Sequence, residues 1–189
     1  MNNIFILIFF ISYATLISIR TYYIKKYHFY KKVIIQRNFK KYFIILLLTI
    51  CWISSIFFFM ISYDFFSVDI KTPIIIKIFF SLLMIPNILL FVYSHRSLEE
   101  NWDLPTEKSN SLVDKKAYKI IRHPIYLTIL FFSLYLIIIS ENITVIILQI
   151  FIIILTIYNM FEEEYKLKIT LTGYDNYMKR TKRLIPFIF

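Results

Sequence analysis

Five long apolar stretches constrain the fold of this chain more than any other feature of its sequence. A helix needs about 20 apolar residues to cross a hydrocarbon core of roughly 30 Å, and these stretches approach or reach that length. We therefore predict an all-α integral membrane protein, with a single membrane domain over residues 1–189. The five expected transmembrane helices cover roughly residues 4–19, 42–61, 73–93, 124–139 and 143–161.

The composition removes several other classes of protein. The chain is 59% hydrophobic, which is far too apolar for a disordered protein. Its single cysteine, Cys51, excludes a disulfide framework. Its single glycine, Gly173, excludes the glycine-rich loops of P-loop and Rossmann proteins. The three histidines and one cysteine lack the spacing of a metal site, so we expect no metal.

The basic residues are distributed unevenly along the chain. Of 22 Lys and Arg residues, 20 follow the first, third or fifth apolar stretch, and the loops on the alternate side hold only Lys71. Lys77 lies inside the third stretch. Since basic residues collect on the cytoplasmic side of membrane proteins, we expect the N-terminus outside and the C-terminus in the cytosol. The positive charge then has anionic lipid headgroups as its partner, and we expect no nucleic acid to bind.

The abundance of Lys, Ile, Asn and Phe suggests an AT-rich genome. This composition favours a bacterial cytoplasmic membrane, or the endoplasmic reticulum if the source is eukaryotic.

Polar residues that can bind a ligand lie at the start of the fourth stretch, in the sequence Arg122-His123-Pro124-Ile125-Tyr126. Proline is favoured in the first turn of a helix and disfavours a helical conformation at the residue before it. Arg122 and His123 therefore lie just ahead of a helix N-terminus, beside the positive end of its dipole, where a carboxylate or phosphate is stabilised. The alternative is that Arg122 reaches lipid headgroups and His123 caps the helix.

Three carboxylates, Glu162, Glu163 and Glu164, follow the fifth stretch directly. They indicate a site for a cationic or hydroxyl-rich ligand, or else a solvated helix with lysine partners. Only residues 140–142 separate the fourth and fifth stretches, so we predict an antiparallel helical hairpin. The carboxylates and the Arg-His pair then lie near each other, which suits a zwitterion that carries an additional positive charge.

Several short motifs follow one another in a fixed order between residues 95 and 189. They are Leu98-x-x-Asn101-Trp102, Leu112-Val113, Tyr118, Arg122-His123-Pro124-x-Tyr126, Glu163-Glu164-x-x-Leu167, Tyr174-x-x-Tyr177 and Pro186. In order and in spacing they resemble the isoprenylcysteine carboxyl methyltransferase family, especially its bacterial-type members, and the related membrane phospholipid methyltransferases. The resemblance implies an integral membrane enzyme that transfers a methyl group from S-adenosylmethionine to a lipophilic substrate that enters from the bilayer.

The resemblance also implies roles for individual residues. The adenosine of the cofactor would be lined by Leu112, Val113 and Tyr118. Its methionine part would be held by His123, Pro124 and Tyr126, and Glu163 with its neighbour Glu164 would bind from the opposite side. The residues nearest the chemistry would be Arg122, His123 and Glu163. The C-terminal segment would cap the cofactor pocket on the cytosolic side.

Four departures from the family pattern keep alternatives open. Leu127 and Thr128 follow Tyr126, where the family commonly has a small residue. Lys116 stands where the family has glycine, and Asn159 stands where it has a substrate-binding arginine. The spacing to Tyr174 is one residue short, so Glu162 can take the place of Glu163. A carboxyl methyltransferase for isoprenylcysteine is the first choice of function. A phospholipid, amine or thiol methyltransferase, a nicotinamide-dependent membrane reductase and a non-enzymatic membrane protein are the alternatives.

Overall fold

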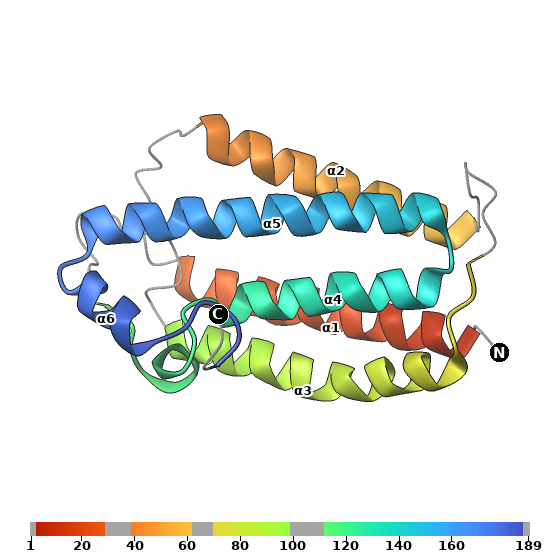
Figure 1. Ribbon diagram of the computed structural model, residues 1–189, viewed down its shortest axis with the longest axis horizontal. Coiled ribbons are helices and arrows are strands. Elements are labelled where there is room, and N and C mark those ends of the chain that lie inside the picture. The colour runs from red at the N-terminus through yellow and green to blue at the C-terminus, as the bar shows by residue number, and fades with distance from the viewer. Residues whose placement is uncertain (1–2, 29–38, 62–69, 99–111, 187–189) are drawn as a thin grey trace. The chain divides into compact units, whose positions relative to one another are not determined.

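The computed structural model describes residues 3–28, 39–61, 70–98 and 112–186, and these are almost entirely helical (Figure 1). An all-α fold is therefore confirmed. In chain order the elements are α1 (Asn3–His28), α2 (Phe39–Ile61), α3 (Ile74–Leu98), the 3₁₀ helix η2 (Lys116–Lys119), α4 (Pro124–Ser140), α5 (Ile143–Thr170) and α6 (Tyr174–Arg180).

Three helices extend well beyond the apolar stretches that predicted them. Helix α1 continues past Arg20 to His28, α3 continues past Tyr93 to Leu98, and α5 continues through Glu162–Glu164 to Thr170. Hydropathy marks the part of a helix that suits lipid. It does not mark where the helix ends, because Lys, Arg and Glu form helices nearly as well as Leu.

Four helical segments are long and apolar enough to cross a membrane: Ile4–Lys26, Phe43–Ile61, Ile74–Leu98 and Ile143–Thr170. They indicate a multi-pass membrane protein. Helix α4 has 17 residues, which corresponds to roughly 25 Å at 1.5 Å per residue. That is shorter than a hydrocarbon core of about 30 Å, so the five predicted crossings are not all confirmed.

The chain divides into two compact units, and most helices contribute residues to both. The first unit comprises Met1–Tyr13, Gln36–Ile85 and Ile129–Asn159. The second unit comprises Ala14–Ile35, Pro86–Thr128 and Met160–Phe189.

Aromatic rings form the core of the first unit. Phe9 of α1 is fully buried, with its ring centroid 4.9 Å from that of Phe132 in α4 and 5.7 Å from that of Phe59 in α2. Such offset and edge contacts add stabilisation beyond the apolar area that they bury. In the same unit α4 and α5 run antiparallel and are joined by a short turn (Figure 1), as the sequence predicted. Asn142 caps α5 by accepting a hydrogen bond from Val145 N at 3.0 Å.

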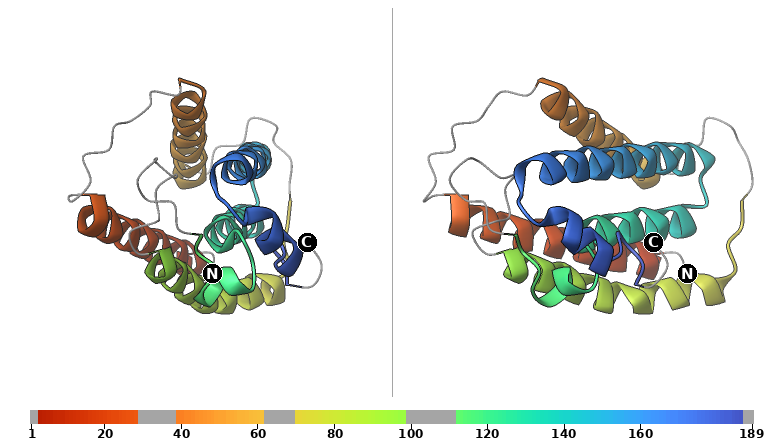
Figure 2. Two further views of the ribbon diagram at one scale, coloured as in Figure 1. Left: turned by 90° about the vertical axis from the view of Figure 1, so that its left-hand side faces the viewer. Right: turned by 60° about the vertical axis from the view of Figure 1, so that its left-hand side comes forward.

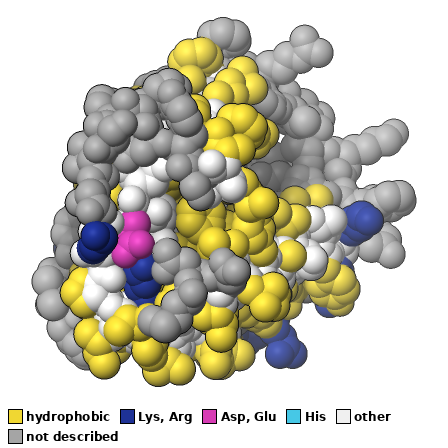
Figure 3. All heavy atoms as spheres, turned by 90° about the vertical axis from the view of Figure 1, so that its right-hand side faces the viewer, with side chains coloured by type: hydrophobic (Ala, Val, Ile, Leu, Met, Phe, Trp, Pro, Cys, Tyr) yellow, Lys and Arg dark blue, Asp and Glu magenta, His cyan; other side chains and the backbone are white. Residues whose placement is uncertain are grey.

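An ion pair lies next to this turn. Glu141, in a left-handed conformation with φ of 49°, accepts from Lys77 Nζ at 2.8 Å and from the backbone N of Thr72 at 2.9 Å. The Lys77 side chain is only 4% exposed. Figure 3 shows acidic and basic side chains together on the face that carries the turn, among many hydrophobic ones. Lys77 thus lies inside an apolar helix because Glu141 neutralises it.

We expect Lys77→Met to lower the free energy of unfolding by about 2 kcal/mol, since it removes the cation that contacts the partly buried Glu141 carboxylate. The double variant Lys77→Met/Glu141→Gln is expected to recover at least half of this loss, because it removes both charges and keeps an acceptor for Thr72. Thermal unfolding in detergent measures both. If Lys77→Met were as stable as the wild type, the ion pair would contribute nothing to the stability of the fold.

The second unit brings its short C-terminal elements against the loop before α4. Helix α6 lies beside the loop that carries η2 (Figure 2), and the Tyr177 hydroxyl donates to the carbonyl oxygen of Tyr118 at 2.6 Å. Gly173, with φ of 85°, supplies the left-handed residue between α5 and α6, a conformation that glycine adopts without steric cost. Asn87 of α3 donates to the carbonyl oxygen of Thr128 in α4 at 3.3 Å.

Candidate functional site

The start of α4 is built as its sequence predicted. Pro124 is the first helical residue, and the His123 carbonyl accepts the first helical hydrogen bond, from Leu127 N at 3.0 Å. The backbone N–H groups of Arg122 and His123 donate instead to the carbonyl oxygens of Lys182 and Arg183, at 2.7 and 3.0 Å. The residues ahead of α4 therefore run alongside the C-terminal segment and are held there by main-chain hydrogen bonds.

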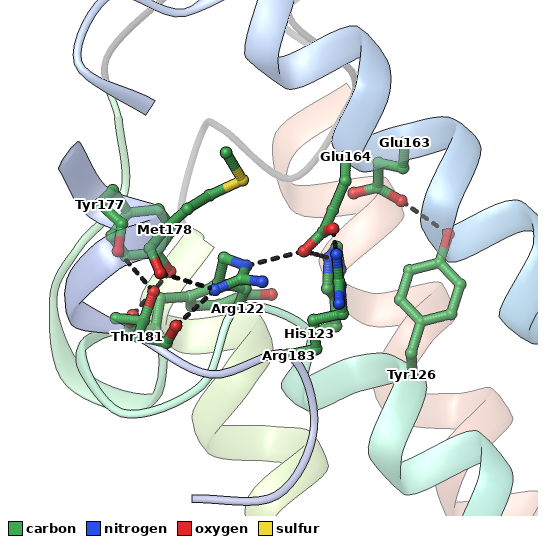
Figure 4. A network of polar contacts seen from close by, with 10 residues as sticks. Arg122, His123, Tyr126, Glu163, Glu164, Tyr177, Met178, Thr181 and Arg183 are labelled. Carbon is green, nitrogen blue, oxygen red and sulfur yellow. Dashed lines mark hydrogen bonds and ion pairs between the residues drawn. The ribbon is translucent and has the colours of Figure 1, made fainter. Parts of the chain in front are cut away.

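Glu164 of α5 lies at the centre of a buried network of charges (Figure 4). Its Oε1 accepts from Arg122 Nε at 2.7 Å and lies 3.2 Å from His123 Nε2, and its Oε2 accepts from Arg183 Nε at 2.8 Å. The side chains of Arg122 and Glu164 are each 8% exposed. Burying charges costs several kcal/mol per ion unless each is paired and hydrogen-bonded, and here a single carboxylate has three basic partners.

Arg122 is engaged on a second side as well. Its Nη1 donates to the carbonyl oxygen of Met178 at 3.2 Å and to that of Thr181. The guanidinium therefore joins α5, the end of α6 and the residues that follow α6. Through these contacts Arg122 holds the C-terminal segment. A contact between Arg122 and the carboxylate of a ligand stays a prediction.

Glu163, next to Glu164, has a different environment. Its Oε2 accepts from the Tyr126 hydroxyl at 2.6 Å (Figure 4). In the described part of the chain it forms no ion pair, in contrast to Glu164. Within residues 3–28, 39–61, 70–98 and 112–186, no cation forms an ion pair with the Glu163 carboxylate.

Two further phenols lie within electrostatic reach of Glu163. Burial, and after it the negative charge of Glu163, raises the pKa of Tyr118 well above its ordinary value. Burial raises the pKa of Tyr174 too, with the carboxylates of Glu164 and Glu163 adding to the effect. Both phenols therefore remain protonated at neutral pH. A carboxylate that is hydrogen-bonded to Tyr126, and whose charge is felt by Tyr118 and Tyr174, suits an organic cation, which is attracted both by the charge and by aromatic rings.

Sequence reasoning missed Arg183, which completes the network around Glu164. It lies in a tail with several other basic residues, and no spacing distinguishes it from them. In the structure its guanidinium also lies 5.0 Å from the ring centroid of Phe161. This contact adds a cation–π attraction between the C-terminal segment and α5.

The remaining predicted residues lie in more ordinary surroundings. Leu112 and Val113 are partly buried in the loop before η2, and Pro124 is fully buried at the start of α4. Asn159 lies in the part of α5 that belongs to the first unit. No group of three His, Cys, Asp or Glu among the described residues is arranged to hold a metal.

Lys116 has a φ of 55°. This left-handed conformation is unfavourable for a residue with a Cβ. We expect Lys116→Gly to raise the free energy of unfolding by about 0.5–1 kcal/mol. Lys116→Ala removes the same side chain but keeps the backbone strain, so it serves as the matched control in thermal unfolding. Equal stability of the two variants would contradict a cost of the backbone conformation.

His95 of α3 is a buried polar residue of the second unit. It is 1% exposed, its Nδ1 donates to the carbonyl oxygen of Phe91 at 2.9 Å, and its ring packs against those of Phe91 and Tyr23. Among the described residues its Nε2 is buried without a hydrogen-bond partner. In the same part of the chain His95 contacts the aromatic residues Phe91 and Tyr23 and none of the carboxylates of α5.

The chain matches no family model and no curated protein at a significant level.

Proposed function

We propose that this protein is a membrane methyltransferase that uses S-adenosylmethionine and acts on a lipophilic substrate. The observation that carries the proposal is the Glu163 carboxylate at the end of an apolar helix, which accepts a hydrogen bond from Tyr126 and has no ion-pair partner among the described residues. The order of motifs from Leu98 to Pro186 supports the same activity through its resemblance to the isoprenylcysteine carboxyl methyltransferase family.

The side chains present fit the cationic parts of this cofactor. S-adenosylmethionine, when bound, supplies an activated methyl group on a positively charged sulfur. Glu163 can hold an ammonium group or ribose hydroxyls, and the rings of Tyr118 and Tyr126 favour a nearby cation. The left-handed conformation of Lys116 lies at the position where the family has glycine, which further supports the resemblance.

Two groups of residues would have separate tasks. Arg122, His123, Glu164 and Arg183 hold the C-terminal segment against the ends of α4 and α5, and so form the wall of the site. Glu163 and Tyr126, which are hydrogen-bonded to each other, would face the ligand. The ring of Tyr126 also packs edge-on against that of His123, with the ring centroids 5.4 Å apart. Most of the rate enhancement would come from orientation and exclusion of water, because methyl transfer to a carboxylate needs no general base.

The proposed substrate enters laterally from the bilayer and reacts on the cytosolic side, with the N-terminus outside. An isoprenylcysteine carboxylate is the first choice by resemblance. A phospholipid or a small amine or thiol is the second, because Asn159 provides no cation for a substrate carboxylate.

Cofactor binding tests the proposal most directly. The purified chain in detergent is titrated with S-adenosylmethionine by calorimetry, and its membranes are then supplied with the methyl-labelled cofactor and either farnesylcysteine or phosphatidylethanolamine. We expect binding, and label that base releases from farnesylcysteine. Base-stable label on the phospholipid would move the assignment to the second substrate class. A folded chain that binds no cofactor would exclude the methyltransferase function.

A further inference from the structure

A groove lies on α3, in the second unit and apart from the carboxylates of α5. It has a volume of about 410 Å³ and is lined by Leu89, Leu90, Val92, Tyr93 and Arg96. Residues three and four apart share one face of a helix, so Leu89, Tyr93 and Arg96 form a single stripe. Leu89 is 63% and Tyr93 46% exposed. The groove therefore offers an accessible apolar surface that ends at a guanidinium, roughly 10 Å from Leu89 along the helix.

A second cation lies at the same end of the groove. Lys116 Nζ lies 3.4 Å from the carbonyl oxygen of Arg96. The Arg96 guanidinium is exposed and forms no ion pair among the residues that the structure describes. The Lys116 side chain thus reaches the backbone of the residue at which the apolar stripe stops. Two basic residues at one helix end favour an anion there.

The order of apolar and charged groups along the groove matches that of a membrane lipid. The continuous apolar run of α3 ends at Tyr93, and aromatic residues followed by basic ones are typical of the membrane–water interface. A phospholipid has its chains in the hydrocarbon and its phosphate at that interface. We infer that this groove binds an anionic phospholipid, with an acyl chain along Leu89 and Tyr93 and the phosphate at Arg96 and Lys116.

This site is separate from the one proposed for the cofactor. The groove carries positive charge, whereas the Glu163 surroundings carry negative charge and suit a cation. The lipid site therefore stands whether or not the protein is a methyltransferase. Lys116 also has a structural role, since a cation near the C-terminus of a helix stabilises its last carbonyls. The experiment therefore separates lipid binding from this structural role.

Native mass spectrometry of the full chain in a mild detergent provides the test. The chain is titrated with phosphatidylglycerol or with phosphatidylcholine of the same acyl chains, and the affinity of the first bound lipid is compared. Each basic residue near a headgroup is worth about a fivefold change in affinity, so we expect the wild type to prefer phosphatidylglycerol by about twentyfold. Arg96→Gln/Lys116→Gln is expected to abolish the preference.

Two further variants keep the inference open to refutation. Lys168→Gln/Arg180→Gln removes two exposed basic residues of the same unit, and we expect it to keep the preference. Leu89→Phe narrows the groove without changing its charge, and we expect it to weaken the first lipid severalfold. Three results would overturn the site and indicate unspecific annular lipid. The wild type could show no preference for phosphatidylglycerol, the two double variants could lose that preference equally, or Leu89→Phe could bind the first lipid as tightly as the wild type.

Discussion

Glu164→Gln is expected to lower the free energy of unfolding by about 3–5 kcal/mol, which is the usual cost of removing one partner from a buried charge network. The variant removes the carboxylate that Arg122 and Arg183 share and turns an amide N–H₂ towards donors. Thermal unfolding in detergent measures the loss. Limited trypsin digestion is expected to cleave the segment around Lys179–Arg183 faster, because the carboxylate that holds this segment is gone.

Asp175→Asn is the matched control for this experiment. It also removes a carboxylate from an ion pair of the second unit, but Asp175 and Lys168 are 3.4 Å apart with 62% and 56% of their side chains exposed. Exposed pairs contribute about 0–1 kcal/mol. If Glu164→Gln were no less stable than Asp175→Asn, the network would not hold the C-terminal segment.

Glu163→Gln is expected to weaken the binding of S-adenosylmethionine by about 100-fold, since a charge-assisted contact to a cation in a partly buried site is worth a few kcal/mol. Stability is expected to change little, because the glutamine oxygen still accepts from Tyr126. Calorimetric titration gives the affinity, and thermal unfolding shows whether the variant remains folded.

Glu162→Gln makes the same change in charge one residue earlier and serves as the comparison. We expect it to change the affinity by less than about threefold, because the contact with Tyr126 belongs to Glu163. The reverse outcome would assign the cofactor contact to Glu162. If both variants bound S-adenosylmethionine as tightly as the wild type, neither carboxylate would belong to the binding site. Binding of the cofactor by the wild type would not be affected by that result.

The fold class could be predicted because the hydropathy of a stretch depends only on the residues that it contains. The apolar stretches give the positions of α1 to α5, and Pro124 gives the start of α4, since proline lacks the N–H that an interior helical residue needs. The ends of α1, α3 and α5 could not be predicted in the same way. Charged residues stop an apolar stretch without stopping a helix, and Glu162–Glu164 continue α5 for that reason.

Most residues of the candidate site could be predicted from the sequence, but which of them contact each other could not. The position of the Arg-His pair and the carboxylates at the ends of one hairpin indicated that they lie close together, and the structure brings Arg122 to Glu164. That Glu164 takes the charge network while Glu163 contacts Tyr126 depends on the rotation of α5. One helical residue corresponds to a turn of about 100°, which no local motif encodes. Arg183 and the pair of Lys77 with Glu141 join residues far apart in the sequence, for which no spacing rule exists.

The attachment of the C-terminal segment has a consequence for how far such a sequence can diverge. Arg122 contacts this segment through the carbonyl groups of Met178 and Thr181, and the N–H groups of Arg122 and His123 bond to the carbonyls of Lys182 and Arg183. Every residue type carries a carbonyl. The side chains at positions such as 178 and 182 can therefore be substituted without loss of these main-chain hydrogen bonds. Relatives of this protein can then share its arrangement of atoms and yet be hard to detect by comparing side chains.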